Sequence, residues 1–455
     1  MVSRQGLETS PAPSRRRRYF HYVLYLGLAL RLFVFLFQDP YNNDNHIQII
    51  DWIRTQGSIP PAAQFSQAYH PPLYHLLAQL FYLGDGSFLS LKLLQLFSLL
   101  TSLLTFVALY RLIDRFFQSE RIRLFSALFV ALLPQFIMFG NYVSMDSLAN
   151  FLGALLLWLA VLYMEKPTLA RKIGLAVVLG LGLSTKGTFL ALAPLVWLWV
   201  VIVERRAGRG VKTVLTSLLL VVALSAALGS YKYVDNWRLY GKPFIHNTDP
   251  LVQKATGWPW ARPQMHTYVG WPSLLDWNVG KLVLHPTLGE TTRHSYFLLL
   301  YGTFWYQYIP ESNLTGNLTK FRALGSLIYI FALLPTLVLI LGGLALAAKI
   351  RAAVRSRKIE SGLLAQIFSG LAFLGVLGLV VFIGVRTDVW SCFQSRLTFP
   401  ALGGLIVLFA FGLEVLERRP TLARAAYFLL TILWGCFILY FLIEFFLGLG
   451  VFGRV

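Results

Sequence analysis

Charged residues are scarce in this 455-residue chain, and cysteine is scarcer still. Charged side chains make up 13% of the residues, about half the share of an ordinary soluble domain, whereas hydrophobic residues make up 56%. Two cysteines, Cys392 and Cys436, support neither a disulfide framework nor a cysteine metal knuckle. The composition excludes an ordinary soluble domain and predicts an integral membrane protein.

Acidic residues are also few: 20 stand against 40 lysines and arginines, which gives a formal charge of +20. Such a charge can indicate nucleic-acid binding, but here the basic residues cluster in short gaps between apolar runs. The clusters are Arg15 to Arg18; Arg111, Arg115, Arg121 and Arg123; Lys166, Arg171 and Lys172; Arg205, Arg206, Arg209 and Lys212; Lys349, Arg351, Arg355, Arg357 and Lys358; and Arg418, Arg419 and Arg424. If all these gaps are cytoplasmic, the positive-inside rule is satisfied six times in succession. The basic excess therefore orients the protein, and we expect membrane lipids rather than nucleic acid as partners.

Apolar runs of roughly 18 to 25 residues, each able to cross about 30 Å of hydrocarbon as a helix, recur along the chain. We predict an all-α polytopic bundle of eleven transmembrane helices, with the amino terminus inside and the carboxyl terminus outside. The predicted spans are residues 19–37, 88–110, 124–140, 147–163, 173–185, 188–203, 213–230, 320–348, 362–385, 397–416 and 425–448. The fifth and sixth are short, so one bent re-entrant pair is the alternative. Residues 1–18 form a basic cytoplasmic tail, and residues 19–455 a single transmembrane domain.

With this orientation, the polar segments that are poor in lysine and arginine all lie on the outer side. They are residues 38–87, the turn at 140–147, a long loop at 231–319 and the segment 386–396. Seven of the eight histidines and eight of the twelve tryptophans fall in these segments. The tryptophans of the long loop form an interfacial belt, a lid over a cleft, or flat faces for sugar rings. Function is expected at the outer membrane face.

The first outer segment holds two short amphipathic patterns. "DNHIQIIDWIRTQ", residues 44–56, places isoleucines and a tryptophan among polar residues, which predicts a helix lying in the interface. Asp44 precedes it, either as a helix cap or as a carboxylate facing a cavity. The paired prolines at 71 and 72 open a second run, "LYHLLAQLFYL", that is short for a span and predicts a second interfacial helix.

These stretches resemble a known family, the membrane glycosyltransferases of the GT-C superfamily, especially the protein O-mannosyltransferase and aminoarabinose transferase branch. The resemblance rests on "NNDNHIQIIDWIRTQGSIP" and "YHPPLYHLL" in the first outer loop, on "NYVSMDSLAN" in the second, on "STKGTFLALAP" and on "QSRLTFPAL". All five stretches occur in the family's order and on one side of the membrane. The sequence departs from the family pattern at Asn45, where glutamate is common, and at Ser395, where glycine is common.

The resemblance implies transfer of a sugar from a polyprenyl-phosphate donor to an acceptor hydroxyl, with inversion, on the periplasmic or extracytoplasmic side of the plasma (inner) membrane. The acceptor is a glycan, a lipid or a protein. Such chemistry needs a carboxylate to remove the acceptor proton, and Asp44 is the predicted base. Asp146 orients the acceptor, holds the sugar or tunes Asp44, and the two carboxylates influence each other if they converge.

The departing phosphate calls for fixed cations, and Lys186 and Arg396 lie at the outer ends of apolar runs. Snorkelling to the outer headgroups is the alternative explanation for both. His70 is a possible donor to the phosphate where relatives carry lysine, and His46 and Tyr74 complete the predicted substrate-binding set. No cofactor is assigned; His46 makes a divalent metal possible, but no spacing of histidines supports one.

Two other function classes remain open from the sequence. A polysaccharide polymerase or ligase has a similar size and similar spans. A lipid-linked sugar flippase or secondary transporter would show repeated halves and charges at mid-membrane. The sequence shows no convincing internal repeat, and apart from Arg31 the charges within spans are few.

Overall fold

The computed structural model describes residues 15–40, 44, 46–65, 67–245, 249, 270–289, 291–306, 321–356, 359–386 and 393–448. Throughout these ranges the regular elements are α-helices and short 3-10 helices. This finding confirms the predicted all-α class.

Each of the eleven predicted spans coincides with a helix or with two consecutive helices. They are α1 (Arg15–Phe37), α4 (Phe88–Phe116), α5 (Glu120–Leu132) with α6 (Pro134–Phe139), α7 (Met145–Glu165), α8 (Leu169–Leu183), α9 (Phe189–Arg206), α10 (Val211–Gly229), α15 (Arg322–Ser356), α16 (Ser361–Gly384), η8 (Ser395–Ala401) with α17 (Leu402–Glu417), and α18 (Pro420–Gly448). Within the described residues, eight helices are long and apolar enough to cross a membrane. Because α5 and α8 are short and α9 ends in three charged residues, a count of eleven spans stays a prediction.

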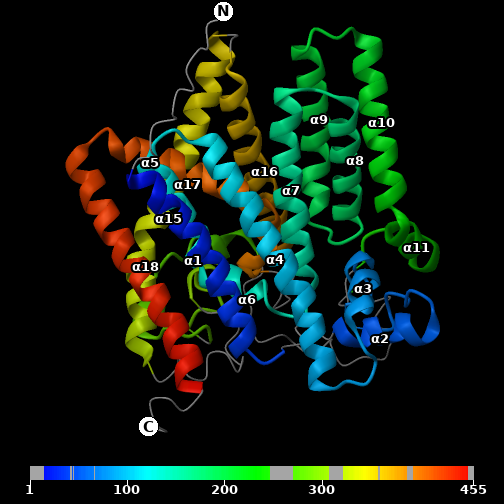
Figure 1. Cartoon of the computed structure of the whole chain (residues 1–455), viewed down its shortest axis with the longest axis horizontal. Coiled ribbons are helices and arrows are strands. Elements are labelled where there is room, and N and C mark those ends of the chain that lie inside the picture. Colours follow the sequence, from blue (N-terminus) through cyan, green and yellow to red (C-terminus); the bar gives the residue numbers. More distant parts are fainter. Residues whose placement is uncertain are drawn as a thin grey trace, which may run out of the picture.

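The two short helices expected in the first outer segment are present as α2 (His46–Gln56) and α3 (Leu73–Ala78). In Figure 1 they lie beside the lower end of the bundle, below α8 and α10. The face of α2 that carries His46, Ile49, Ile50 and Ile53 is buried, as the amphipathic pattern requires.

The segment 231–319, predicted only as a loop, contains helical elements. They are α11 (Tyr231–Tyr240), η4 (Trp271–Leu274), α13 (Gly280–Leu284) and α14 (Tyr296–Trp305). The apolar α14 is mostly buried and packs against α6, α15 and η8. Its ten residues are too few to cross a bilayer, which is why hydropathy did not identify it as part of the bundle.

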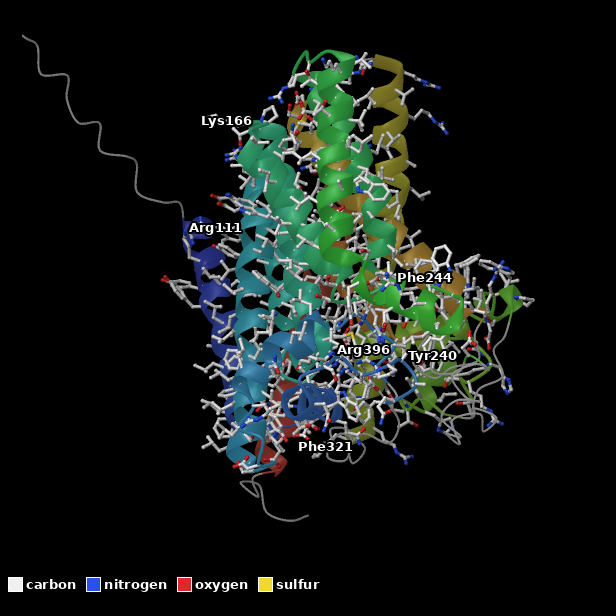
Figure 2. The ribbon with its side chains drawn as sticks, turned by 90° about the vertical axis from the view of Figure 1, so that its right-hand side faces the viewer. Arg111, Lys166, Tyr240, Phe244, Phe321 and Arg396 are labelled. Atoms are coloured by element: carbon white, nitrogen blue, oxygen red, sulfur yellow. The ribbon has the colours of Figure 1, made fainter. Side chains whose placement is uncertain are left out.

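Residues of two basic gaps lie away from the predicted site. Figure 2 shows Arg111 and Lys166 toward one end of the bundle, whereas Tyr240, Phe321 and Arg396 lie toward the other. Which side of a membrane each end faces stays a prediction from the charge pattern.

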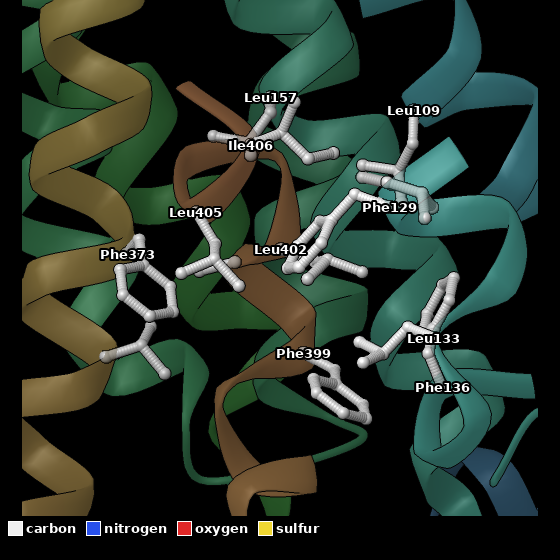
Figure 3. Close-up of a cluster of buried hydrophobic side chains, with 14 of the residues drawn as sticks. Leu109, Phe129, Leu133, Phe136, Leu157, Phe373, Phe399, Leu402, Leu405 and Ile406 are labelled. Atoms are coloured by element: carbon white, nitrogen blue, oxygen red, sulfur yellow. The ribbon is translucent and has the colours of Figure 1, made fainter. Parts of the chain in front are cut away.

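Helix α17 forms the centre of the bundle. The apolar 18-residue stretch within Ser395–Glu417 is 83% buried inside the protein, compared with 28% for that of α1, so α17 has protein neighbours over much more of its surface. It packs against α5, α15, α16 and α18. In Figure 3 its side chains Leu402 and Leu405 lie among Leu157, Phe373 and Phe399. This packing fixes the position of η8, the turn that precedes α17.

Small residues let α15 approach α17 closely. A Cβ at Gly342 would collide with the backbone carbonyl of Leu408, and one at Gly412 with that of Val338. The two contacts are reciprocal, so each helix presents a glycine to the other helix's backbone. Close approach through glycine is a common way for membrane helices to pack.

We predict that Gly342→Ala lowers the thermal stability of the purified protein, because the added methyl forces these helices apart at a cost of about 1–3 kcal/mol. The adjacent Gly343 is a matched control: its Cβ would meet nothing within 4 Å. Gly343→Ala should leave the melting temperature unchanged or raise it slightly. Equal melting temperatures for the two variants would contradict the proposed close packing.

Candidate functional site

Four charged side chains from distant parts of the chain meet in the half of the bundle away from Arg111 and Lys166. Asp44 precedes α2, Asp146 lies in the first turn of α7, Lys186 lies in the turn between α8 and α9, and Arg396 lies in η8. All four were predicted site residues.

Arg396 joins the two aspartates. Its Nη1 lies 2.8 Å from Oδ2 of Asp146, and its Nη2 lies 2.8 Å from Oδ2 of Asp44. The Nζ of Lys186 forms an ion pair with the other oxygen, Oδ1, of Asp146. The four groups therefore form a continuous chain in the order Asp44, Arg396, Asp146, Lys186.

The four linked side chains differ in their exposure to solvent. The side chains of Asp146, Arg396 and Lys186 are only 2%, 4% and 7% exposed, whereas that of Asp44 is 30% exposed. Buried charges are costly unless they are paired, and here two cations balance two carboxylates. Burial lowers the pKa of Lys186, and its contact with Asp146 opposes that effect. Asp44 is thus the member of the chain that solvent or a substrate reaches.

Local structure holds Asp146 in place. Ser144 is the N-cap of α7: its Oγ accepts a hydrogen bond from the backbone N–H of Asp146 at 3.3 Å and donates one to Oδ2 at 3.2 Å. A carboxylate in the first turn of a helix is also stabilised by the helix dipole. Sequence reasoning placed Asp146 at the start of this span but did not identify Ser144.

Asp44 has an unusual backbone conformation. Its φ is +60°, and among the non-glycine residues that the structure describes it alone has a positive φ. Aspartate tolerates the left-handed region better than most residues, yet such a conformation still costs free energy. The ion pair with Arg396 is one interaction that offsets this cost.

Two further contacts hold Arg396 and the turn that carries it. The ring of Phe139, in α6, lies 4.8 Å from its guanidinium carbon, a cation–π distance. The backbone N–H of the preceding residue, Ser395, donates a 3.1 Å hydrogen bond to Oγ1 of Thr303 in α14. Neither Phe139 nor Thr303 was predicted to support the site, because both contacts join segments far apart in the sequence.

A second group of predicted residues is buried beside α3. His46 and Tyr74 are 1% and 0% exposed, and their rings pack 5.7 Å apart. Nδ1 of His46 lies 3.0 Å from Nε2 of His75, which sequence reasoning missed although it stands as a polar residue inside an apolar run. His70 lies apart from this group, in the turn before α3, where its half-buried ring packs on Tyr69.

A metal site is not evident among the described residues, since no group of three or more histidine, cysteine, aspartate or glutamate side chains is placed to hold an ion. His246 and His266 lie outside the described residues.

Residues 69–230 match the family model described as dolichyl-phosphate-mannose-protein mannosyltransferase. The matched segment contains α3, Asp146, Lys186 and the helices between them. This match confirms the predicted resemblance to membrane glycosyltransferases of the GT-C superfamily. No curated protein matches the chain.

Several solved structures are similar at low sequence identity. The Archaeoglobus fulgidus oligosaccharyltransferase, in complex with Zn and sulfate, aligns at 14% identity and a TM-score of 0.49, over 94% of this chain and 53% of its own. ArnT from Cupriavidus metallidurans, in the apo state, aligns at 15% identity and a TM-score of 0.37, over 88% of this chain and 78% of its own. The S. cerevisiae protein O-mannosyltransferase Pmt1-Pmt2 complex aligns at 14% identity and a TM-score of 0.38, over 57% of this chain and 39% of its own. The chain thus spans about half the length of the oligosaccharyltransferase.

We predict that the paired histidines make stability fall in mild acid. Burial is the main cause that lowers the pKa of His46 to about 3, and it also lowers that of His75 well below its usual value. Both rings are then neutral in the folded protein. In the unfolded chain each of these two histidines binds a proton below about pH 6.5. Stability is lost as the pH falls below that value, by up to about 1.4 kcal/mol per pH unit for each histidine.

The measurement is the melting temperature of the detergent-solubilised protein between pH 7.5 and pH 5. The double variant His46→Gln and His75→Gln should show a flatter profile than the wild type. His285→Gln, at an exposed position, is the control and should keep the wild-type slope. An unchanged slope in the double variant would show that the pair is not neutral and buried.

Proposed function

We propose that this protein is a glycosyltransferase that moves a sugar from a polyprenyl-phosphate donor to an acceptor hydroxyl. The observation that carries the proposal is the chain of charges from Asp44 through Arg396 and Asp146 to Lys186. The family match supports the donor class, because dolichyl phosphate is a polyprenyl phosphate.

Asp44 is the proposed general base. Of the two aspartates, it has the more exposed side chain, and it meets Arg396 through one oxygen, Oδ2. Asp146 is nearly inaccessible and both of its oxygens meet cations, so its carboxylate is poorly suited to take a proton. Asp146 instead holds Arg396 and Lys186 in position.

The reaction proceeds in one displacement. The acceptor oxygen forms a bond to the anomeric carbon on the face opposite the phosphate, the carbon–oxygen bond to the phosphate breaks, and the acceptor proton passes to the Asp44 carboxylate. One displacement inverts the anomeric configuration. The polyprenyl phosphate leaves with an added negative charge, which Arg396 and Lys186 stabilise.

The pairing of these cations with carboxylates suits this role. Two cations and two carboxylates give the site no net formal charge, so the donor phosphate meets no net repulsion as it approaches. Arginine presents a planar fork of donors, and a phosphate can share it with the aspartates. We assign His70 a hydrogen bond to the donor phosphate. His46 and Tyr74, which were predicted to bind substrate, are buried, and we assign them a place behind the groups that contact the substrate.

The proposed setting is the outer, extracytoplasmic face of the plasma (inner) membrane. Arg396, which joins the other charged groups, lies in the half of the bundle away from Arg111 and Lys166, and the donor's polyprenyl chain would lie in the surrounding lipid. The acceptor is a glycan, a lipid or a protein that approaches from the aqueous side.

We predict that Asp44→Asn abolishes sugar transfer but preserves donor binding, because the amide keeps the shape of the carboxylate but removes the base. A positioned base contributes about 10²–10⁴-fold to a rate, so turnover should fall by at least about 100-fold. The assay incubates purified protein with a panel of radiolabelled polyprenyl-phosphate sugars and measures transfer, hydrolysis and bound donor.

Asp51→Asn is a matched control, because Asp51 lies on α2 only seven residues away and is not part of the charge chain. It should retain wild-type turnover. Transfer that survives intact in Asp44→Asn would count against the assigned base. If the wild type bound none of the donors, a transport function would be favoured instead.

A further inference from the structure

Arg31 is the one arginine in the described chain that is fully buried within a membrane-spanning helix. It lies in α1 and is 0% exposed. None of the carboxylates that the structure describes forms an ion pair with it. A charge in this position is expensive and usually has a function, yet the proposed transfer reaction makes no use of Arg31.

The Arg31 guanidinium contacts backbone carbonyls and aromatic rings. Nη1 donates a 2.9 Å hydrogen bond to the carbonyl of Gly27 in its own helix, and Nη2 donates a 3.3 Å hydrogen bond to the carbonyl of Val130 in α5. The rings of Phe106 and Phe136 lie 4.4 Å and 5.1 Å from the guanidinium carbon. These rings belong to α4 and α6, so one side chain contacts three neighbouring helices.

The carbonyl of Val130 needs such a donor because of Pro134. In a continuous helix the N–H four residues later would bond to this carbonyl, and residue 134 is a proline, which has no N–H. The intervening Leu133 has φ −60° and ψ 111°, outside the helical region, and it separates α5 from α6. In a membrane interior, a carbonyl released by proline must be satisfied by a neighbouring group. Arg31 supplies the missing hydrogen bond.

The break at Pro134 also directs α6 toward the candidate active site. Phe136 and Phe139 lie one turn apart on α6: Phe136 packs on Arg31, and Phe139 packs on Arg396. Phe139 is followed closely by the turn that leads to Ser144 and Asp146. The direction of α6 therefore sets the position of the Phe139 ring, which packs on Arg396.

We propose that Arg31 is a positioning residue for this site: it satisfies the carbonyl released by Pro134 and, through Phe136, holds α6 so that Phe139 supports Arg396. The catalytic part of this inference rests on the proposed transferase function. The hydrogen-bond part does not, and it can be tested without any activity.

The test is a thermal-stability cycle of the full-length protein in detergent, comparing wild type, Arg31→Met, Pro134→Ala and the double variant. Methionine retains bulk but cannot donate, so Arg31→Met should lower the melting temperature by several degrees. Alanine at 134 restores an N–H that can bond to Val130. Arg31→Met should therefore cost much less in the Pro134→Ala background than in the wild type.

Turnover should behave differently from stability. The double variant should recover stability but remain at least about tenfold below the wild type in kcat, with little change in donor KM, because a continuous α5–α6 helix moves Phe139 away from Arg396. Arg31→Lys can still donate to the Val130 carbonyl, so its melting temperature and its kcat should lie between those of Arg31→Met and the wild type. Arg111→Met, at an exposed arginine of α4, is the control and should match the wild type.

Each result is decisive for one part of the proposal. An equal cost of Arg31→Met in the two backgrounds would overturn the pairing of Arg31 with the Val130 carbonyl. Wild-type turnover in the double variant would overturn the positioning role of the α6 break. Absence of transfer by the wild type with every donor would refute the proposed function instead, while the stability cycle would remain interpretable.

Discussion

Charge pairing among mostly buried side chains is the interaction on which the candidate site depends. Arg396 is nearly buried, and its two terminal nitrogens bind two different aspartates. Removing Asp146, Arg396 or Lys186 would leave an uncompensated charge, which costs several kcal/mol in a poorly solvated position. The fold must therefore place Asp44, Asp146 and Lys186 close to one another and to Arg396.

Packing between helices that are distant in the sequence positions these four side chains. The central position of α17 fixes η8 and with it Arg396. Two hydrogen bonds attach the segment 38–87 to its neighbours: the backbone N–H of Leu73 donates to the carbonyl of Ser184, and the buried side-chain Nζ of Lys232, in α11, donates to the carbonyl of Pro60. Asp44 is thus carried by a segment fastened near Lys186, while its own backbone adopts a rare conformation.

Much of this site was predictable, because a charged or polar residue at the outer end of an apolar run is conspicuous in a membrane protein. Lys186 and Arg396 were identified in this way, Asp44 was noted before the first amphipathic helix as a cap or a cavity-facing carboxylate, and family resemblance added Asp146. Their mutual contacts were not predictable from residue patterns, since Arg396 and Asp44 are separated by 352 positions and no local rule relates them.

The supporting residues were harder to find for a similar reason. Phe139 and Thr303 look like ordinary members of apolar segments, and their significance comes only from packing on Arg396 and on η8. Helix α14 is too short to register as a span, yet it is buried in the bundle. Hydropathy reports length and polarity, whereas these roles depend on which helices become neighbours.

Two arginines contact the short helix α6, Arg31 through Phe136 and Arg396 through Phe139. This arrangement connects the backbone break at Pro134 with the charged groups of the candidate site. Aromatic rings tolerate such cations in apolar surroundings better than aliphatic side chains do, which suits a helix that contacts two buried arginines.

The most direct test of the account is an experimental structure of the protein in a lipid nanodisc, determined at a resolution that shows side chains. The account predicts that the Arg396 guanidinium lies between the carboxylates of Asp44 and Asp146, with Lys186 on the far side of Asp146. A structure in which Arg396 faces the lipid headgroups, or in which the two aspartates lie apart without a shared cation, would contradict it.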